Sequence, residues 1–144
     1  MKAALIALIA ASLSACMSAD MRQYGKLDPD EKSITVPPGG GLAAELKDVL
    51  SARGWTLVVD RGPDVIEGRN SGSVNLKSYN TFNTRYRLML RAAQFDTCLN
   101  MSGAYSYNMS VIDNKTGREL MVMEGRACES QIKSKFESFL NSAS

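Results

Sequence analysis

Apolar and polar residues alternate along two stretches in the second half of the chain, which is the pattern of strands with one buried face, and a third stretch returns from the second as its hairpin partner. The first stretch covers 84–93, and its apolar face carries Tyr86, Leu88, Leu90 and Ala92. The second covers 104–112, and the third covers 118–125 after a turn at 113–117 that ends in glycine. Glycine suits the positive φ of a hairpin turn. The pattern therefore predicts three consecutive antiparallel strands.

Two other stretches repeat apolar residues at intervals of three and four positions, which is typical of a helix with one buried stripe. The first helix is expected over 42–53, just before a glycine, with a stripe of Leu42, Leu46, Val49 and Leu50. The second is expected over 129–141, with a stripe of Ile132, Phe136, Phe139 and Leu140. Charged residues occupy the other faces, so each helix is expected to cover one side of a sheet.

Shorter runs complete the set of expected elements. Residues 33–36 form an apolar run that two prolines stop, which indicates a short strand. Residues 55–59 are apolar almost throughout, which favours a strand in the middle of the sheet, buried on both faces. A short strand is expected at 65–67. Residues 68–83 are polar and rich in Gly, Asn and Ser, which predicts a long loop with a short edge strand at 74–76.

These elements indicate an α+β fold built as one domain over 33–144. We expect a two-layer α/β sandwich, with a mostly antiparallel sheet and the helices 42–53 and 129–141 on one face. The other face of the sheet is left partly polar and available to a partner. A chain of 144 residues, 44% of them hydrophobic, can build one core of this kind.

The first sixteen residues read MKAALIALIAASLSAC, with one charge, an apolar centre too short to span a bilayer, and small residues at the exit. The exit, Leu13 to Cys16, resembles the lipobox of bacterial lipoproteins at all four positions. The resemblance implies that residues 1–15 are a signal peptide. It also implies that the Cys16 sulfur is lipidated and that Cys16 becomes the N-acylated first residue of the mature protein.

A lipidated Cys16 implies a membrane as the first partner of the chain. Met17 stands where an aspartate would imply retention at the inner membrane, which favours the periplasmic face of the outer membrane. Residues 16–32 are polar and charged, and they are expected to form a flexible tether that reaches roughly 20 Å.

The segments GLAAELKDVLSARGWTLVV and VIDNKTGREL place a strand, helix and strand before a hairpin. This order is similar to small envelope lipoprotein domains of the curli-assembly and TolB N-terminal type. The resemblance covers about 100 residues and implies a role in the assembly of an envelope complex, with an envelope protein as partner.

Two cysteines remain in the mature domain. Cys98 follows the first of the three alternating strands and Cys128 follows the third, so an up-down-up meander places both at one end of the sheet. An even pair of cysteines in an exported domain is expected to form a disulfide. The alternative is two separate buried thiols.

The amino-acid composition excludes several classes of catalytic and metal-binding site. The chain has no histidine, which excludes Ser-His-Asp and Cys-His catalysis and metal sites that need imidazole. Lys and Arg total 17 and Asp and Glu total 15, and this balance gives no sign of nucleic-acid binding. The carboxylates show no spacing that forces a catalytic pair. We expect no enzyme activity, no metal and no cofactor.

Arg85, Arg87 and Arg91 lie on one face of the strand expected at 84–93. They are a candidate partner surface for an anionic group. The alternative is a solvated sheet face on which they pair with Glu119 or Glu124 across strands.

The leading functional hypothesis is a non-enzymatic, lipid-anchored accessory or scaffold subunit of an envelope assembly. Two alternatives remain open. A periplasmic inhibitor of a lysozyme-like enzyme would use the loop 68–83 as its inhibitory segment, and a small ligand- or lipid-binding lipoprotein would need an apolar cavity.

Overall fold

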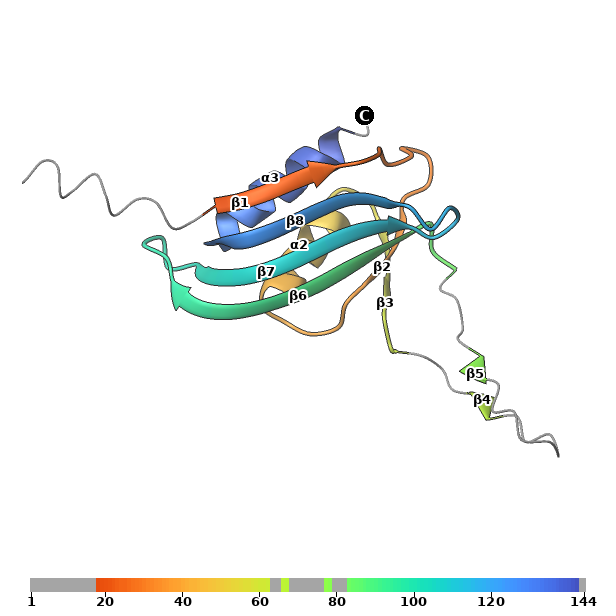
Figure 1. The fold of residues 1–144 in the computed structure, drawn as a ribbon, viewed down its shortest axis with the longest axis horizontal. Coiled ribbons are helices and arrows are strands. Elements are labelled where there is room, and N and C mark those ends of the chain that lie inside the picture. The colour runs from red at the N-terminus through yellow and green to blue at the C-terminus, as the bar shows by residue number, and fades with distance from the viewer. Residues whose placement is uncertain (1–17, 63–65, 68–76, 79–82, 143–144) are drawn as a thin grey trace, which may run out of the picture.

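The computed structural model describes residues 18–62, 66–67, 77–78 and 83–142 (Figure 1). Its elements, in chain order, are β1 (Ser18–Gln23), β2 (Ser33–Val36), α2 (Leu42–Ala52), β3 (Thr56–Val59), β4 (Ile66–Glu67), β5 (Lys77–Ser78), β6 (Tyr86–Thr97), β7 (Gly103–Asp113), β8 (Glu119–Cys128) and α3 (Glu129–Asn141). The α+β class is therefore confirmed. Both expected helices are present, α2 one residue shorter than predicted and α3 with the predicted bounds.

Six of the strands form one mixed sheet in the order β1-β8-β7-β6-β2-β3. The neighbours β6, β7 and β8 are antiparallel, which confirms the predicted meander. Strand β2 runs parallel to both β3 and β6, and its pairing with β3 follows from the strand-helix-strand crossover that β2, α2 and β3 form. The short strands β4 and β5 pair with each other in a separate two-stranded ribbon.

The core lies between the helices and the sheet. Both predicted apolar stripes are buried, and α2 and α3 contact each other. In Figure 1 both helices lie behind the strands. The strands contribute alternate residues to this core: Tyr105, Tyr107 and Met109 of β7 are buried, whereas Ser106 and Asn108 between them are exposed.

Strand β1 corrects the expectation of a flexible tether over 16–32. Six residues of that segment pair with β8, from Ser18 beside Arg126 to Gln23 beside Met121. Only two apolar residues of β1, Ala19 and Met21, face the core, and this alternation is too short to predict a strand.

Strand β3 also departs from expectation. The apolar run at 55–59 predicts a strand in the middle of the sheet, but β3 is an edge strand with Val58 and Val59 exposed. Strand β2 lies between β6 and β3. Strand β3 therefore has a neighbour on one side only and is outermost in the sheet.

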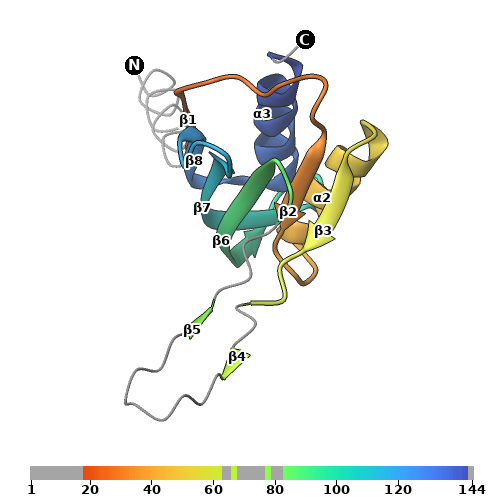
Figure 2. The same ribbon diagram turned by 90° about the vertical axis from the view of Figure 1, so that its right-hand side faces the viewer.

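Strand β6 is longer than predicted and is paired along only part of its outer side. Strand β2 meets it at Tyr86 and Arg87 alone, while β7 accompanies it to Thr97. Figure 2 shows β2 and β3 turning away from β6. Within the described residues, the outer side of β6 beyond Arg87 is therefore an open sheet edge.

The remaining expectations concern the segment between β3 and β6. The short strand predicted at 65–67 corresponds to β4, whose partner β5 was not expected. The edge strand predicted at 74–76 lies outside the described residues, as does most of the loop 68–83.

Gly125 of β8 has φ +141° and lies against the backbone of β1. A Cβ at this position would lie 2.2 Å from the carbonyl oxygen of Ser18. We predict that Gly125→Ala lowers the free energy of unfolding by about 1–3 kcal/mol, because it strains the backbone and pushes β1 off the sheet. Chemical denaturation measures the loss, and hydrogen exchange of the β1 amides locates it.

Gly40→Ala is the matched control, since a Cβ there meets no atom within 4 Å. It should change stability by less than about 0.5 kcal/mol. Equal stability of the Gly125→Ala protein and the wild type would contradict the close β1–β8 pairing.

Candidate functional site

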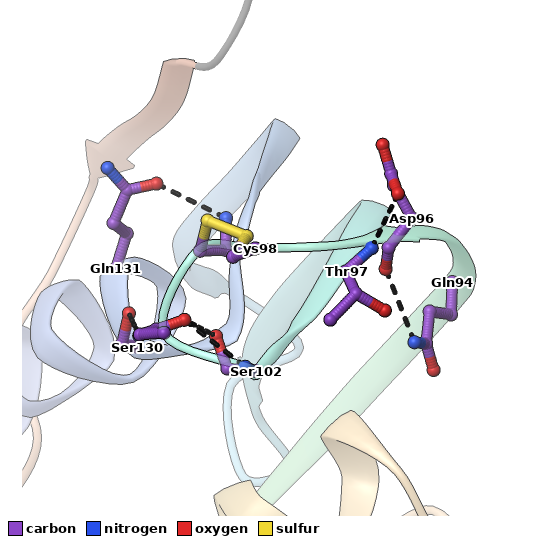
Figure 3. Close-up of a disulfide and its surroundings, with 9 residues drawn as sticks. Gln94, Asp96, Thr97, Cys98, Ser102, Ser130 and Gln131 are labelled. Atoms are coloured by element: carbon purple, nitrogen blue, oxygen red, sulfur yellow. Dashed lines mark hydrogen bonds between the residues drawn. A yellow bond between two sulfur atoms is a disulfide. The ribbon is translucent and has the colours of Figure 1, made fainter.

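A disulfide joins Cys98 to Cys128 at one end of the sheet (Figure 3). Their Cα atoms lie 6.1 Å apart. Cys98 follows the last residue of β6 and Cys128 is the last residue of β8, so the antiparallel meander brings both to the same end. The bond therefore ties the β6–β7 turn to the beginning of α3.

The turn between β6 and β7, residues 98–102, is held by several hydrogen bonds. The Cys98 amide donates to the Ser102 carbonyl at 2.8 Å, and the Met101 amide donates to the Cys98 carbonyl at 2.9 Å. The Asn100 side chain accepts from the Ser102 hydroxyl at 2.7 Å and donates to the Ser130 hydroxyl of α3 at 3.3 Å. The turn is thus fixed both internally and to the helix.

Large apolar side chains are exposed on and beside this turn. The exposed fraction is 106% for Leu99, 84% for Met101 and 43% for Phe95 of β6. The Arg126 guanidinium lies over the Phe95 ring at 4.1 Å from its centroid. This apolar group was not predicted from the sequence. The available signal was two large apolar residues in a polar turn that begins at a cysteine.

The three arginines of the candidate partner surface are separated by the structure. Arg85 lies just before β6, and its side chain is mostly buried in ion pairs with Glu31 and Asp113. Arg87 pairs with Asp60 at 2.8 Å, and Arg91 is exposed on β6. None of these carboxylates is Glu119 or Glu124, the partners that the sequence suggested.

Asp113 holds the hairpin turn between β7 and β8. Its carboxylate accepts the backbone amides of Lys115 and Thr116 at 2.9 and 3.2 Å, in addition to the Arg85 guanidinium. Burial alone would raise the pKa of this carboxyl, but the bonds from Arg85 and the two amides outweigh burial and lower the pKa below its ordinary value. Asp113 and Arg85 therefore stabilise the end of the sheet opposite the disulfide.

A hollow of about 580 Å³ lies beside this cluster. Its lining is polar and charged, and consists of Asp30, Glu31, Lys32, Ser33, Thr56, Asn83, Thr84, Arg85, Asn114 and Lys115. Such a lining does not suit an apolar ligand.

The sheet face turned away from the helices is mostly polar, although Met89 and Val122 share it. Polar and charged side chains of four neighbouring strands share it in register: Asp20 and Arg22 of β1, Glu124 and Arg126 of β8, Ser106, Asn108 and Ser110 of β7, and Arg87 and Arg91 of β6. Across this face Arg22 pairs with Glu124 at 2.6 Å, and Asn108 donates to the same carboxylate at 3.3 Å. We call this surface the open face.

The part of the chain that the structure describes has no cluster of three or more residues able to hold a metal ion. None of its helices is long and apolar enough to cross a membrane. The predicted lipidation site, Cys16, lies two residues before the described part begins.

Comparison with known proteins finds the fold in solved structures. No protein-family model matches the sequence, and no curated protein matches it. A point variant of PelC from Paraburkholderia phytofirmans, a dodecamer, is similar with a TM-score of 0.50 and 10% identity, covering 89% of this chain and 95% of that one. A second PelC dodecamer from the same organism has a TM-score of 0.45 and 14% identity over 88% and 94% of the two chains. The first likeness shows a shared fold.

We predict that replacing both disulfide cysteines, Cys98→Ser with Cys128→Ser, lowers the free energy of unfolding by about 3–4 kcal/mol. The bond closes a loop with a sequence separation of 30, and its loss frees the unfolded chain. Urea denaturation of the purified protein measures the change. Wild-type protein treated with a reductant should lose a similar amount, and an unchanged midpoint in both would contradict the assigned bond.

We predict that Asp113→Asn lowers the free energy of unfolding by about 1–3 kcal/mol at pH 7. The pKa of Asp113 is lower in the folded protein than the ordinary value of about 3.9, so its charged form contributes stability above that pH. This contribution is lost as the pH falls through the folded-state pKa. The gap between wild type and variant should therefore narrow below about pH 4, as denaturation at several pH values would show.

Asp48→Asn, on the exposed side of α2, is the control and should leave stability nearly unchanged. A gap between Asp113→Asn and the wild type that stays constant down to pH 2 would refute the ionic role of Asp113.

Proposed function

We propose that this chain is a non-enzymatic, lipid-anchored protein of the bacterial envelope. In this proposal it is held at the periplasmic face of the outer membrane and serves as an accessory or scaffold subunit of an envelope assembly. The LSAC lipobox at 13–16 supports the anchor.

One observation carries the proposal. Strand β1 begins at Ser18, two residues after Cys16, and is part of the main sheet. A lipid on Cys16 would therefore hold the sheet directly against the membrane, because two residues of chain extend about 7 Å at most. A domain attached in this way suits a fixed position in an assembly.

The proposed architecture has two layers, in which α2 and α3 cover one face of the sheet. The open face then remains for an envelope protein partner. Its mixture of paired charges and amides fits a polar protein surface, since non-obligate interfaces are about as polar as the rest of a protein surface.

Further copies of this chain are proposed as part of the assembly. The PelC variant of similar fold is a dodecamer. In this chain β1, β3 and the outer side of β6 beyond Arg87 are open sheet edges, which other copies can pair with.

A non-enzymatic role is consistent with the residues present. The chain has no histidine to act as a general base or to activate a thiol. Its two cysteines in the folded domain are bonded to each other, and Asp113, the most buried carboxylate among the described residues, is engaged by Arg85.

We predict that Cys16→Ser moves the protein from the membrane fraction to the soluble periplasm of a Gram-negative host. Acyl chains on Cys16 contribute about 0.8 kcal/mol for each buried methylene, and the variant lacks them. Fractionation, with mass spectrometry of the mature N-terminus, measures the effect.

The control is the double Cys98→Ser, Cys128→Ser protein, which keeps the lipobox and should stay with the membrane. A Cys16→Ser protein that remains in the membrane fraction would contradict the anchor. Density separation of the two membranes tests the outer-membrane assignment. Purification of the wild type in detergent tests the assembly, because a complex well above the 15.7 kDa of one chain is expected.

A further inference from the structure

We propose that the β6–β7 turn inserts Leu99 and Met101 into the lipid bilayer beside the anchor, as a second membrane contact. The proposal rests on the proposed function, in which a lipid on Cys16 brings this end of the domain to the membrane. It adds an interaction surface and identifies lipid acyl chains as its partner.

The start of β1 and the turn lie at the same end of the sheet. Ser18, the first residue of β1, is paired with Arg126 of β8, so the antiparallel register puts the start of β1 at the end of β8 that carries Cys128. Cys128 lies two residues beyond Arg126, about 7 Å along the strand. The Cα of Cys98, the first residue of the turn, is 6.1 Å from that of Cys128. Figure 1 shows the start of β1 and the β6–β7 turn at one end of the molecule.

The two apolar side chains are unusually accessible. Leu99 is fully exposed and Met101 is 84% exposed, more than any other large apolar side chain in the described part of the chain. Exposed apolar groups gathered on one projection mark an interaction site, because their contact with water is unfavourable and their burial against a partner lowers the free energy.

The turn cannot bury these side chains by folding back on the domain. The disulfide and the hydrogen bond from Asn100 to Ser130 tie it to α3. Met101 has φ +63°, a conformation that a residue with a side chain adopts only where its surroundings hold it. The turn is therefore a preformed apolar projection that pays little conformational entropy on insertion.

Residues behind the tip suit the interfacial region of a bilayer. Phe95 is half exposed, with Arg126 over its ring, and an aromatic ring beside a cation is favoured at the headgroup level. The other charges at this end are mixed in sign: Asp20, Asp96 and Lys135 are exposed there, and Glu129 is partly buried. Insertion is therefore driven by apolar contact and not by attraction to anionic lipids.

Tryptophan at position 99 reports on the contact directly. The full lipidated chain with Leu99→Trp is reconstituted in phosphatidylethanolamine and phosphatidylglycerol vesicles whose acyl chains carry bromine, which quenches nearby indole. The wild type supplies the background, since its single tryptophan, Trp55, is buried. We expect the added fluorescence to be quenched at least about two-fold, to shift to the blue, and to change little when phosphatidylglycerol is omitted.

Thr116→Trp is the matched control, because Thr116 lies in the exposed β7–β8 turn at the opposite end of the sheet. Its fluorescence should not be quenched. Equal quenching at the two positions, or none at 99, would overturn the proposal. The proposal would also be overturned if the Trp at position 99 became shielded from solvent only when a purified protein partner was added, because the turn would then contact protein and not lipid.

A second experiment tests the membrane contact of the turn independently of acylation at Cys16. A Cys16→Ser chain with a histidine tag at its mature N-terminus is bound to vesicles through nickel-chelating lipids, which places the start of β1 at the membrane without acylation. Quenching at 99 in this arm supports the turn contact even where Cys16 proves unmodified in cells. Replacing Met101 by Ser in the Leu99→Trp chain should weaken the quenching, and no quenching in the tagged chain would refute the contact.

Discussion

The antiparallel pairing of β1 with β8 is the interaction on which the functional reading of this structure depends. It covers six residues, from Ser18 to Gln23, and it includes the earliest residue that the structure describes. Without it, the segment after Cys16 would be a free link of about fifteen residues, and the domain could adopt any orientation at a membrane. With it, the chain joins the sheet at Ser18, so the proposed anchor on Cys16 would act at one end of the sheet. Gly125 makes the close approach possible, because a side chain there would collide with the Ser18 carbonyl.

The two ends of the sheet are stabilised by different chemistry. At the end near β1, a disulfide joins the β6–β7 turn to the start of α3. At the opposite end, the Arg85–Asp113 ion pair and the amides of the β7–β8 turn perform the same task. A disulfide adds no charge of its own to its end of the sheet, whereas the ion pairs place charged groups around the other turn. The end that carries exposed Leu99 and Met101 is thus the one whose crosslink is compatible with hydrocarbon.

Local patterns along the chain predicted much of the fold. The apolar stripes of α2 and α3 and the alternation in β6 and β7 reflect burial of one face, and this signal lies within each segment. The same meander placed Cys98 and Cys128 at one end. What sequence reasoning missed depends on partners far along the chain. Strand β1 has only Ala19 and Met21 as core residues, and it is a strand because β8 is beside it. Strand β3 is an edge because β6 occupies the other side of β2.

In the candidate site, contacts between segments far apart in the chain were even harder to predict from the sequence. Arg85 appeared to belong to a row with Arg87 and Arg91, but Glu31 and Asp113 engage it from segments 54 and 28 positions away in the chain, a pairing that no spacing rule predicts. The exposure of Leu99 was not predicted either: its place in a polar turn is visible in the sequence, but an apolar residue there is usually expected to fold against a neighbour. The disulfide and the Asn100 bonds prevent this, and they follow from the meeting of β6, β8 and α3.

Attachment at one end of the sheet also determines how copies of the domain would face one another. When the end with Ser18 and Leu99 faces a bilayer, the strands point away from the membrane. The open edges at β1, β3 and the outer side of β6 then lie sideways, toward neighbours in the membrane plane. Sideways edges favour lateral association over stacking, because each copy presents unpaired backbone groups to the next at the same height. A short link and a second contact through the turn would therefore do more than retain the protein at a membrane: they would align its copies for assembly.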